Sequence, residues 1–423
     1  MRENNYKNRQ EVESITNELW KSINILRGAL PVEHYHVYLF LLSGYYDGTI
    51  KSSYFNSVTN YYDSICLAFS SESKYSELLD VYLPIIKNIP DSKLCNLLSR
   101  LSFFNFDLLE NNFVEVFDIL LFKLADVQGK NSGEFLLPDE ISKFVMDLAD
   151  VPENAKVFNP FAGLASFATY LKKNVSYIGQ EILNTTWALG KLRLIVQQRN
   201  NTVDYYNGDS INEWPIEEGF DLVIANPPFN MKINRYITDY DYNRTIMTAE
   251  QYVLKKGLES INSEGKVICV ASQSTLFKGG AERRYRKKLI ESGQIDTVIS
   301  LPGGLLKHTG VSICIIILSK KIKNDNLIQF IDGESFLVNA GKKNKRLDND
   351  KLLRYIRSAQ NDEFVKQVHA KKIAENDYNL SVQRYFVDGF EGTELSKISK
   401  VLNGERVKDV KQGYFIGTNS LKE

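Results

Sequence analysis

Residues 220–229 read Phe-Asp-Leu-Val-Ile-Ala-Asn-Pro-Pro-Phe, and they are the most informative segment for the fold class. Its first six residues are almost all apolar, which predicts a short strand buried on both faces. The strand must end at Asn226, because Pro227 and Pro228 each fix their own φ and restrict the residue before them. We therefore expect a central strand that runs directly into a rigid turn, Asn226-Pro227-Pro228-Phe229.

Short apolar runs of the same kind recur on both sides of this strand and alternate with helical stretches. The predicted strands are 156–158, 176–178, 221–225, 267–271, 297–301 and 313–319. The predicted helices between them are 184–199, 250–263 and 281–291. Buried strands joined by helical crossovers indicate an α/β fold with a mostly parallel, doubly wound sheet. Ligands bind such sheets beyond the carboxyl ends of the strands.

Three parts are expected along the chain. Residues 1–128 are predicted to form an all-α N-terminal domain, because apolar residues recur there at steps of three and four. These repeats lie in 78–86, 94–101 and 113–124. We interpret this part as a packing or partner-binding domain, since it holds no cluster of catalytic side chains. Residues 129–387 are predicted to form the doubly wound domain, and the tail, 388–423, the start of a further one.

The composition excludes several classes of protein. The 423 residues carry 52 Lys and Arg against 52 Asp and Glu, which excludes a polycation that binds nucleic acid through bulk charge but allows a local basic patch. The four cysteines lack C-x-x-C spacing, so we expect neither a disulfide framework nor a metal site. The polar N-terminus and the shortness of the longest apolar run, 313–318, predict a cytoplasmic protein without membrane spans.

The loop after the first predicted strand is suited to a nucleoside-containing cofactor. Residues 158–166 read Phe-Asn-Pro-Phe-Ala-Gly-Leu-Ala-Ser, and their small residues let the backbone approach a ligand. A helix beginning there would favour an anionic group. Glu181 ends the second strand, where a carboxylate can accept both hydroxyls of a ribose. The alternative is a plain strand–turn–helix that merely requires small residues.

The turn at 226–229 presents hydrogen-bond acceptors beside an aromatic face. The Asn226 side-chain oxygen and the Pro227 carbonyl can both accept protons from one exocyclic amine. Two such acceptors would direct the lone pair of the amine nitrogen at an electrophile, and Phe229 offers a face on which a planar base can stack. Simple loop punctuation is the alternative interpretation of the two prolines.

Together these stretches resemble the DNA adenine-N6 methyltransferases, most closely the modification subunits of type I restriction–modification systems. The similar stretches are 133–138, 158–167, 179–182, 208–210, 226–229, 298–304, 309–311, 375–380 and 384–385. The cofactor loop precedes the catalytic turn, as in the subgroup whose target-recognition region is C-terminal. The tail from Leu395 is similar to the start of such a region, which would make the chain a modification–specificity fusion that ends early.

The resemblance implies a Rossmann-like domain that transfers a methyl group from S-adenosylmethionine to a flipped adenine. The implied catalytic residues are Asn226, Pro227, Pro228 and Phe229. The implied cofactor-binding residues are Phe135, Pro138, Asn159, Pro160, Phe161, Gly163, Ser166, Glu181, Asp209 and Ser210. The implied partners are double-stranded DNA, a specificity subunit or fused target-recognition domain, and a restriction subunit.

A basic run at 278–288 is the candidate DNA contact, with six Lys or Arg residues against one Glu. Lys278, Arg283, Arg284 and Arg286 are the predicted contacts, because two glycines before a predicted helix suit a turn that grips phosphate. The alternative is that the run is an ordinary solvated face.

Three positions depart from the family pattern: Asn159 stands where Asp is usual, Ala165 where Gly is usual, and Leu137 where Thr is usual. Asn159 can still orient the loop by hydrogen bonding, whereas Ala165 is expected to need a negative φ. Two alternatives stay open. These departures favour a subunit with this fold that only binds DNA or partners. The other alternative rests on the turn at 226–229, which also serves methyltransferases that act on a protein glutamine or an RNA base.

Overall fold

The computed structural model describes residues 2–51, 60–128, 137–199, 202–215, 219–233, 247–306, 310–321, 326–339, 345–358 and 361–387. Residues 1–386 form one compact unit, and 387–423 are separate from it. Phe135 and the tail, 388–423, lie outside the described residues, so the predictions for them stay predictions. Within the described residues, no helix is long and apolar enough to cross a membrane.

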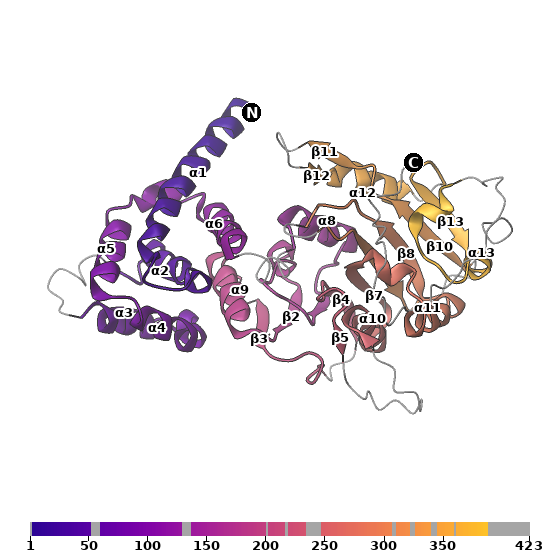
Figure 1. Cartoon of the computed structure of the whole chain (residues 1–423), viewed down its shortest axis with the longest axis horizontal. Helices are drawn as coiled ribbons and strands as arrows, with labels where there is room; N and C mark the ends of the chain where they lie inside the picture. The colour runs from indigo at the N-terminus through magenta and orange to yellow at the C-terminus, as the bar shows by residue number, and fades with distance from the viewer. Residues whose placement is uncertain are drawn as a thin grey trace, which may run out of the picture. The chain divides into compact units, whose positions relative to one another are not determined.

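The N-terminal part is helical, as the apolar spacing predicts (Figure 1). Its helices are α1 (Arg2–Ile23), α2 (Val37–Tyr46), α3 (Tyr61–Ser70), α4 (Leu79–Lys87), α5 (Asp91–Ser102) and α6 (Phe113–Gln128). Its 3-10 turns are η1 (Asn24–Leu26), η2 (Val32–His34), η4 (Ser73–Leu78) and η5 (Phe106–Leu109). Helix α2 is buried on every side, and a helix that is apolar all round belongs in a core.

A nine-stranded sheet follows, in the order β13-β10-β8-β9-β7-β4-β1-β2-β3. Its strands are β1 (Lys156–Asn159), β2 (Ser176–Glu181), β3 (Val203–Asn207), β4 (Phe220–Ala225), β7 (Ile261–Ser272), β8 (Ile295–Ser300), β9 (Ile313–Ser319), β10 (Leu327–Asp332) and β13 (Val365–His369). The neighbouring pairs are parallel except those that involve β9 or β13. The predicted mostly parallel α/β fold is therefore confirmed.

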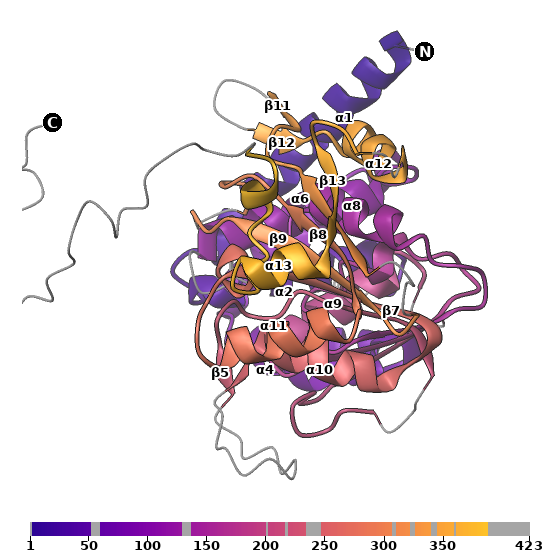
Figure 2. The same cartoon turned by 90° about the vertical axis from the view of Figure 1, so that its right-hand side faces the viewer.

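Helices cover both faces of the sheet, as a doubly wound fold requires. Figure 2 shows α10 (Ala249–Ser260), α11 (Ala281–Glu291) and α13 (Ala370–Glu375) on one face. The other face carries α8 (Asp139–Ala149), α9 (Asn184–Val196) and α12 (Asn349–Ser358). Each face of the sheet has its own hydrophobic core, and neighbouring residues of β4 alternate between them. Val223 packs in the core beneath α10, α11 and α13, and Leu222 packs in the core beneath α8, α9 and α12. The helix predicted at 250–263 ends earlier than expected, because α10 ends at Ser260 and β7 begins at the next residue.

Short elements complete the described chain. They are η6 (Ala168–Tyr170), η7 (Gln273–Leu276), η8 (Val382–Tyr385) and two small antiparallel sheets, β5 (Lys232–Ile233) with β6 (Met247–Thr248) and β11 (Leu337–Asn339) with β12 (Lys345–Leu347).

The chain reverses its direction across the sheet beside β1. Strands β1, β2 and β3 succeed one another toward one edge, and β4 then returns to the other side of β1. Val157 and Phe158 of β1 pair with Leu222 and Val223 of β4. The loops that follow β1 and β4 therefore begin at neighbouring strand ends and run in opposite directions from there. That is the position where open α/β sheets bind ligands.

Candidate active site

A cavity of about 310 Å³ lies at the carboxyl ends of β1, β2, β3 and β4. It brings together nine of the predicted site residues: Pro160, Phe161, Gly163, Ser166, Glu181, Asp209, Ser210, Asn226 and Pro228. Three apolar wall positions lie outside the stretches that resemble the family: Leu183, Ile211 and Met231. Each of them is within two residues of such a stretch. An apolar residue beside a motif carries no signal of its own, which is why the sequence did not predict these three.

The loop after β1 is shaped by one buried amide and two left-handed residues. Asn159 is fully buried, and its Oδ1 accepts a hydrogen bond from the Phe161 N–H at 3.2 Å, which orients the loop. Gly163 has a φ of +54°. The expectation that Ala165 has a negative φ is wrong, because its φ is +55°. A residue with a Cβ loses about 1–2 kcal/mol in this conformation, so the surroundings must hold it there.

The predicted helix after this loop is absent. Residues 160–167 form turns, and the next element, η6, is a single 3-10 turn of three residues. The expected N-terminal end of an α-helix therefore does not face the cavity. The loop offers its ligand single backbone groups without the dipole of a long helix.

Glu181 connects the end of β2 to the loop after β1. Its side chain is buried, with Oε2 accepting the Gly163 N–H at 3.1 Å and Oε1 accepting the Leu183 N–H at 2.9 Å. Burial raises the pKa of this carboxyl above its ordinary value, and the backbone N–H groups partly oppose that rise. A carboxylate oxygen can accept more than one hydrogen bond, so both oxygens of Glu181 can still accept a hydrogen bond from a ligand in the cavity.

The turn after β3 is fastened to the loop after β1. The Ser210 hydroxyl lies 2.7 Å from Gln180 Oε1 and also within hydrogen-bond distance of the Pro160 carbonyl oxygen. Asp209 Oδ1 accepts the Ile211 N–H at 2.9 Å. Ser210 therefore positions the wall of the cavity, a role that the sequence did not reveal because Gln180 and Pro160 are distant along the chain.

The turn after β4 places an unsatisfied acceptor at the cavity. Asn226 lines the wall, and its Oδ1 is buried without a hydrogen-bond partner among the described residues. Pro228 lines the same wall, Pro227 is buried beside it, and Phe229 is half-buried against the core. A buried acceptor left unpaired costs roughly 1–3 kcal/mol, which is a reason to expect that a ligand supplies the donor.

Glu250 supports the segment that follows this turn, a role that no motif indicates, because Glu250 reads only as an acidic residue early in a helix. Its side chain is completely buried in α10, and Oε1 accepts the Asn230 N–H at 2.9 Å. The Asn230 Oδ1 in turn accepts hydrogen bonds from the Ser274 hydroxyl, at 3.0 Å, and from the Lys278 ammonium. Asn230, the residue after the turn at 226–229, is thus held from two sides.

The basic run divides into exposed and buried members. Arg284 is exposed, and Arg283 pairs with Asp377 and lies over the Tyr378 ring. Arg286 is 5% exposed, and its guanidinium donates to the carbonyl oxygens of Thr275, Lys278 and Tyr378. Burial contradicts the prediction that Arg286 contacts DNA. It fastens the segment after β7 instead.

Pro138 and Lys278 both lie near the cavity without lining it. Pro138 is the residue before α8 and does not line the cavity, although its neighbour Leu137 does. Lys278 donates a hydrogen bond from its ammonium to Asn230, close to the turn at 226–229, and is only partly exposed. These two predicted roles, in the cofactor site and the DNA interface, stay predictions.

Comparison with known proteins identifies relatives of the chain. The family model described as N-6 DNA Methylase matches residues 109–392. The type I restriction enzyme MpnII methylase subunit of Mycoplasma pneumoniae is 28% identical over 79% of this chain and 68% of its own length. The HindI methylase subunit of Haemophilus influenzae is 25% identical over 52% of this chain and 53% of its own length.

Solved structures share the fold. The crystal structure of a type I restriction-modification system methyltransferase subunit from Streptococcus thermophilus superimposes with a TM-score of 0.71 at 20% identity. The match covers 88% of this chain and 99% of that subunit. The helical N-terminal part and the nine-stranded sheet therefore recur together in a known architecture.

Proposed function

The chain belongs to the N-6 DNA methylase family, and from this premise we propose that it is the modification subunit of a type I restriction–modification system. It transfers a methyl group from S-adenosylmethionine to N6 of adenine in DNA. The observation that carries the proposal is the buried Asn226 Oδ1, which has no hydrogen-bond partner among the described residues and lies in the wall of the cavity that the loop after β1 and Glu181 also line.

The residues of the cavity fit S-adenosylmethionine. Glu181 retains acceptor capacity for the two ribose hydroxyls, and the backbone of the loop at Gly163 approaches the cavity without a side chain. The volume of about 310 Å³ is within the range of small-molecule sites. When bound, the cofactor supplies a sulfonium methyl group that is already electrophilic, so no general base of unusual pKa is required.

Asn226 acts on the acceptor of the methyl group. Its Oδ1 and the Pro227 carbonyl oxygen accept hydrogen bonds from the two N–H groups of the adenine amine and orient its nitrogen toward the methyl carbon. The amine releases one of these protons to solvent after it has taken the methyl group. Because the two prolines hold these acceptors rigid, little reorganisation is needed at the moment of transfer. The contribution is mainly one of orientation, with the reacting atoms brought to roughly 3 Å.

DNA must present its adenine outside the duplex to reach this cavity. Flipping a base costs a few kcal/mol, and stacking on an aromatic ring recovers part of that cost. Phe229 is the ring proposed for stacking, and Arg283, Arg284 and Lys278 are the proposed phosphate contacts. Since the net charge is zero, most of the sequence recognition is assigned to a specificity subunit or target-recognition domain.

A methyl-transfer assay tests the function. The chain, with and without its specificity subunit, is incubated with labelled S-adenosylmethionine and with duplex DNA, RNA and protein acceptors. Mass spectrometry of the digested acceptor should find N6-methyladenine in the DNA. Labelled RNA or a methylated glutamine, with unlabelled DNA, would assign a different substrate to the same chemistry. No transfer with any acceptor, despite bound cofactor, would favour a subunit that only binds.

A further inference from the structure

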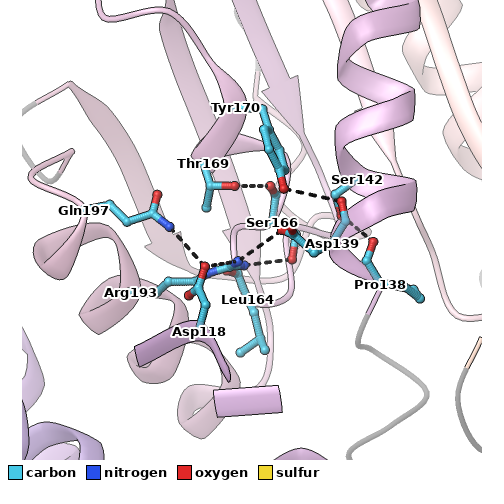
Figure 3. Close-up of polar contacts among 10 residues, drawn as sticks. All are labelled: Asp118, Pro138, Asp139, Ser142, Leu164, Ser166, Thr169, Tyr170, Arg193 and Gln197. Carbon is cyan, nitrogen blue, oxygen red and sulfur yellow. Dashed lines mark hydrogen bonds and ion pairs between the residues drawn. The ribbon is translucent and has the colours of Figure 1, made fainter. Parts of the chain in front are cut away.

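Arg193 of helix α9 is a charged side chain with no exposure to solvent. Figure 3 shows its guanidinium between helix α6 and the loop after β1. Nε donates to Asp118 Oδ1 and Nη2 donates to Asp118 Oδ2, both at 2.8 Å. Paired donors that meet both carboxylate oxygens fix the guanidinium in orientation as well as in position. The Phe122 ring, one turn further along α6, lies 5.7 Å from the guanidinium carbon.

The remaining nitrogen of Arg193 holds the loop that lines the cavity. Nη1 donates to Ser166 Oγ at 3.1 Å and to the Leu164 carbonyl oxygen at 3.4 Å (Figure 3). These two groups flank Ala165, the residue with a φ of +55°. A residue in this conformation persists only where the surrounding structure holds it. Arg193 supplies such a hold on both sides of Ala165.

The same guanidinium faces the start of helix α8. Nη2 lies 3.9 Å from Asp139 Oδ1, at the first residue of α8 and two residues after Leu137 in the cavity wall. The Tyr170 hydroxyl donates to the Asp139 carbonyl oxygen at 3.4 Å, which links η6 to the same point. Helix α6, the cofactor loop and the start of α8 therefore meet at one buried arginine.

We infer that Asp118 and Arg193 are positioning residues by which the helical N-terminal part sets the shape of the cofactor loop. This inference rests on the proposed function, because it assigns S-adenosylmethionine to the cavity. Asp118 neutralises and orients a buried guanidinium whose other acidic neighbour, Asp139, is more distant, at 3.9 Å. Nη1 then holds the Leu164 carbonyl and the Ser166 hydroxyl in place, and because Ala165 lies between them, these two hydrogen bonds also hold the turn at Ala165. The affinity for the cofactor consequently depends on a carboxylate in a helix that does not line the cavity.

A second ion pair provides the matched control. Lys191, also in α9, pairs with Glu77 of η4 at 3.0 Å and so joins the same helix to the same N-terminal part. It makes no described contact with residues 162–166. If the Asp118–Arg193 pair only held α9 in place, loss of either pair would have similar consequences for the cavity.

The test is calorimetric titration of the full chain with S-adenosylmethionine, at a temperature where thermal denaturation finds each variant folded. Asp118→Asn should weaken binding about tenfold, within the range of couplings that pass through packed side chains. The KM for the cofactor should rise in parallel while kcat stays near the wild-type value. Asp118→Glu, which restores the charge, should recover part of the affinity, and Glu77→Gln should leave it unchanged.

Arg193→Lys is the second variant, in case Asp118→Asn does not fold. A lysine keeps a positive charge for Asp118 but has no second nitrogen to donate to Ser166 and Leu164. Arg193→Lys should therefore also weaken cofactor binding. Wild-type affinity in folded Asp118→Asn or Arg193→Lys, or a loss no larger than that of Glu77→Gln, would overturn the inference. A wild-type chain that binds no cofactor would instead refute the proposed function on which the inference rests.

Discussion

Replacing Gly190 by alanine tests whether the close approach of helix α9 sets the position of the cofactor loop. A Cβ at this residue would lie 2.9 Å from Tyr205 Cε1 and 3.0 Å from the Gly163 carbonyl oxygen. Both separations are shorter than van der Waals contact, so the loop or the tyrosine must move. The Tyr205 hydroxyl also donates to the Gly163 carbonyl oxygen, which means that the two neighbours move together.

The magnitude follows from two opposing contributions to stability. Overpacking a buried site costs roughly 1–3 kcal/mol, whereas alanine in place of glycine stabilises a helix interior by about 1 kcal/mol. The free energy of unfolding should therefore fall by about 0–2 kcal/mol, which leaves the chain folded. The displaced loop should weaken S-adenosylmethionine binding roughly 5- to 10-fold, equivalent to about 1–1.4 kcal/mol.

Calorimetric titration of Gly190→Ala beside Gly257→Ala separates the loop effect from overpacking itself. Gly257 of α10 is the matched control, because its added Cβ would lie 2.9 Å from both methyl carbons of Val267, in the core and not in the cavity wall. It should lose comparable stability in thermal denaturation and keep wild-type affinity. Equal affinities in the two variants would refute the reasoning.

Three further predictions concern the site. Because the pKa of Glu181 is raised, acidification should protonate this carboxylate, and so weaken cofactor binding, at a higher pH than for a glutamate of ordinary pKa. Glu181→Gln should bind the cofactor weakly and without this pH dependence. The same raised pKa affects the free energy of unfolding of the free protein. The Glu181 carboxyl contributes stability at a pH below its ordinary pKa, and this contribution disappears as the pH rises through the raised pKa. Denaturation measured at a series of pH values should show this dependence in the wild type and not in Glu181→Gln. Glu250→Ala should lower kcat by about tenfold through misplacement of the catalytic turn with cofactor binding retained, and Glu250→Gln should recover most of the rate; equal rates in both variants would exclude a positioning role. Arg284→Gln should lower DNA affinity and reduce its salt dependence by about one phosphate contact, and an unchanged salt slope would remove Arg284 from the interface.

Much of the fold follows from local pattern. The strand at 313–319 and the helix at 281–291 have the predicted bounds, because apolar runs and amphipathic spacing begin and end sharply there. The meeting of Glu181 with Asn226 was also predictable, since both follow strands whose carboxyl ends share one edge of a parallel sheet.

The failures share a physical cause. A strand buried on both faces reads alike in either direction, so the antiparallel course of β9 left no mark in its residues. Arg286 resembles its exposed neighbours in sequence, and only the carbonyl groups of distant segments give it a buried role. Ala165, with its φ of +55°, likewise lies between two groups that Arg193 bonds, and a helical pattern presents Arg193 as one more polar residue.

The most direct measurement is single-turnover methyl transfer to DNA by Asn226→Ala, with calorimetric titration of the same variant. Asn262→Ala is the control, because Asn262 bonds Asp221 at the opposite end of β4. We predict that Asn226→Ala slows transfer by at least about 100-fold, on the order of the loss of one preorganised transition-state hydrogen bond, while cofactor affinity stays close to wild type. Transfer at the wild-type rate would contradict the assignment of Asn226 as the acceptor for the adenine amine.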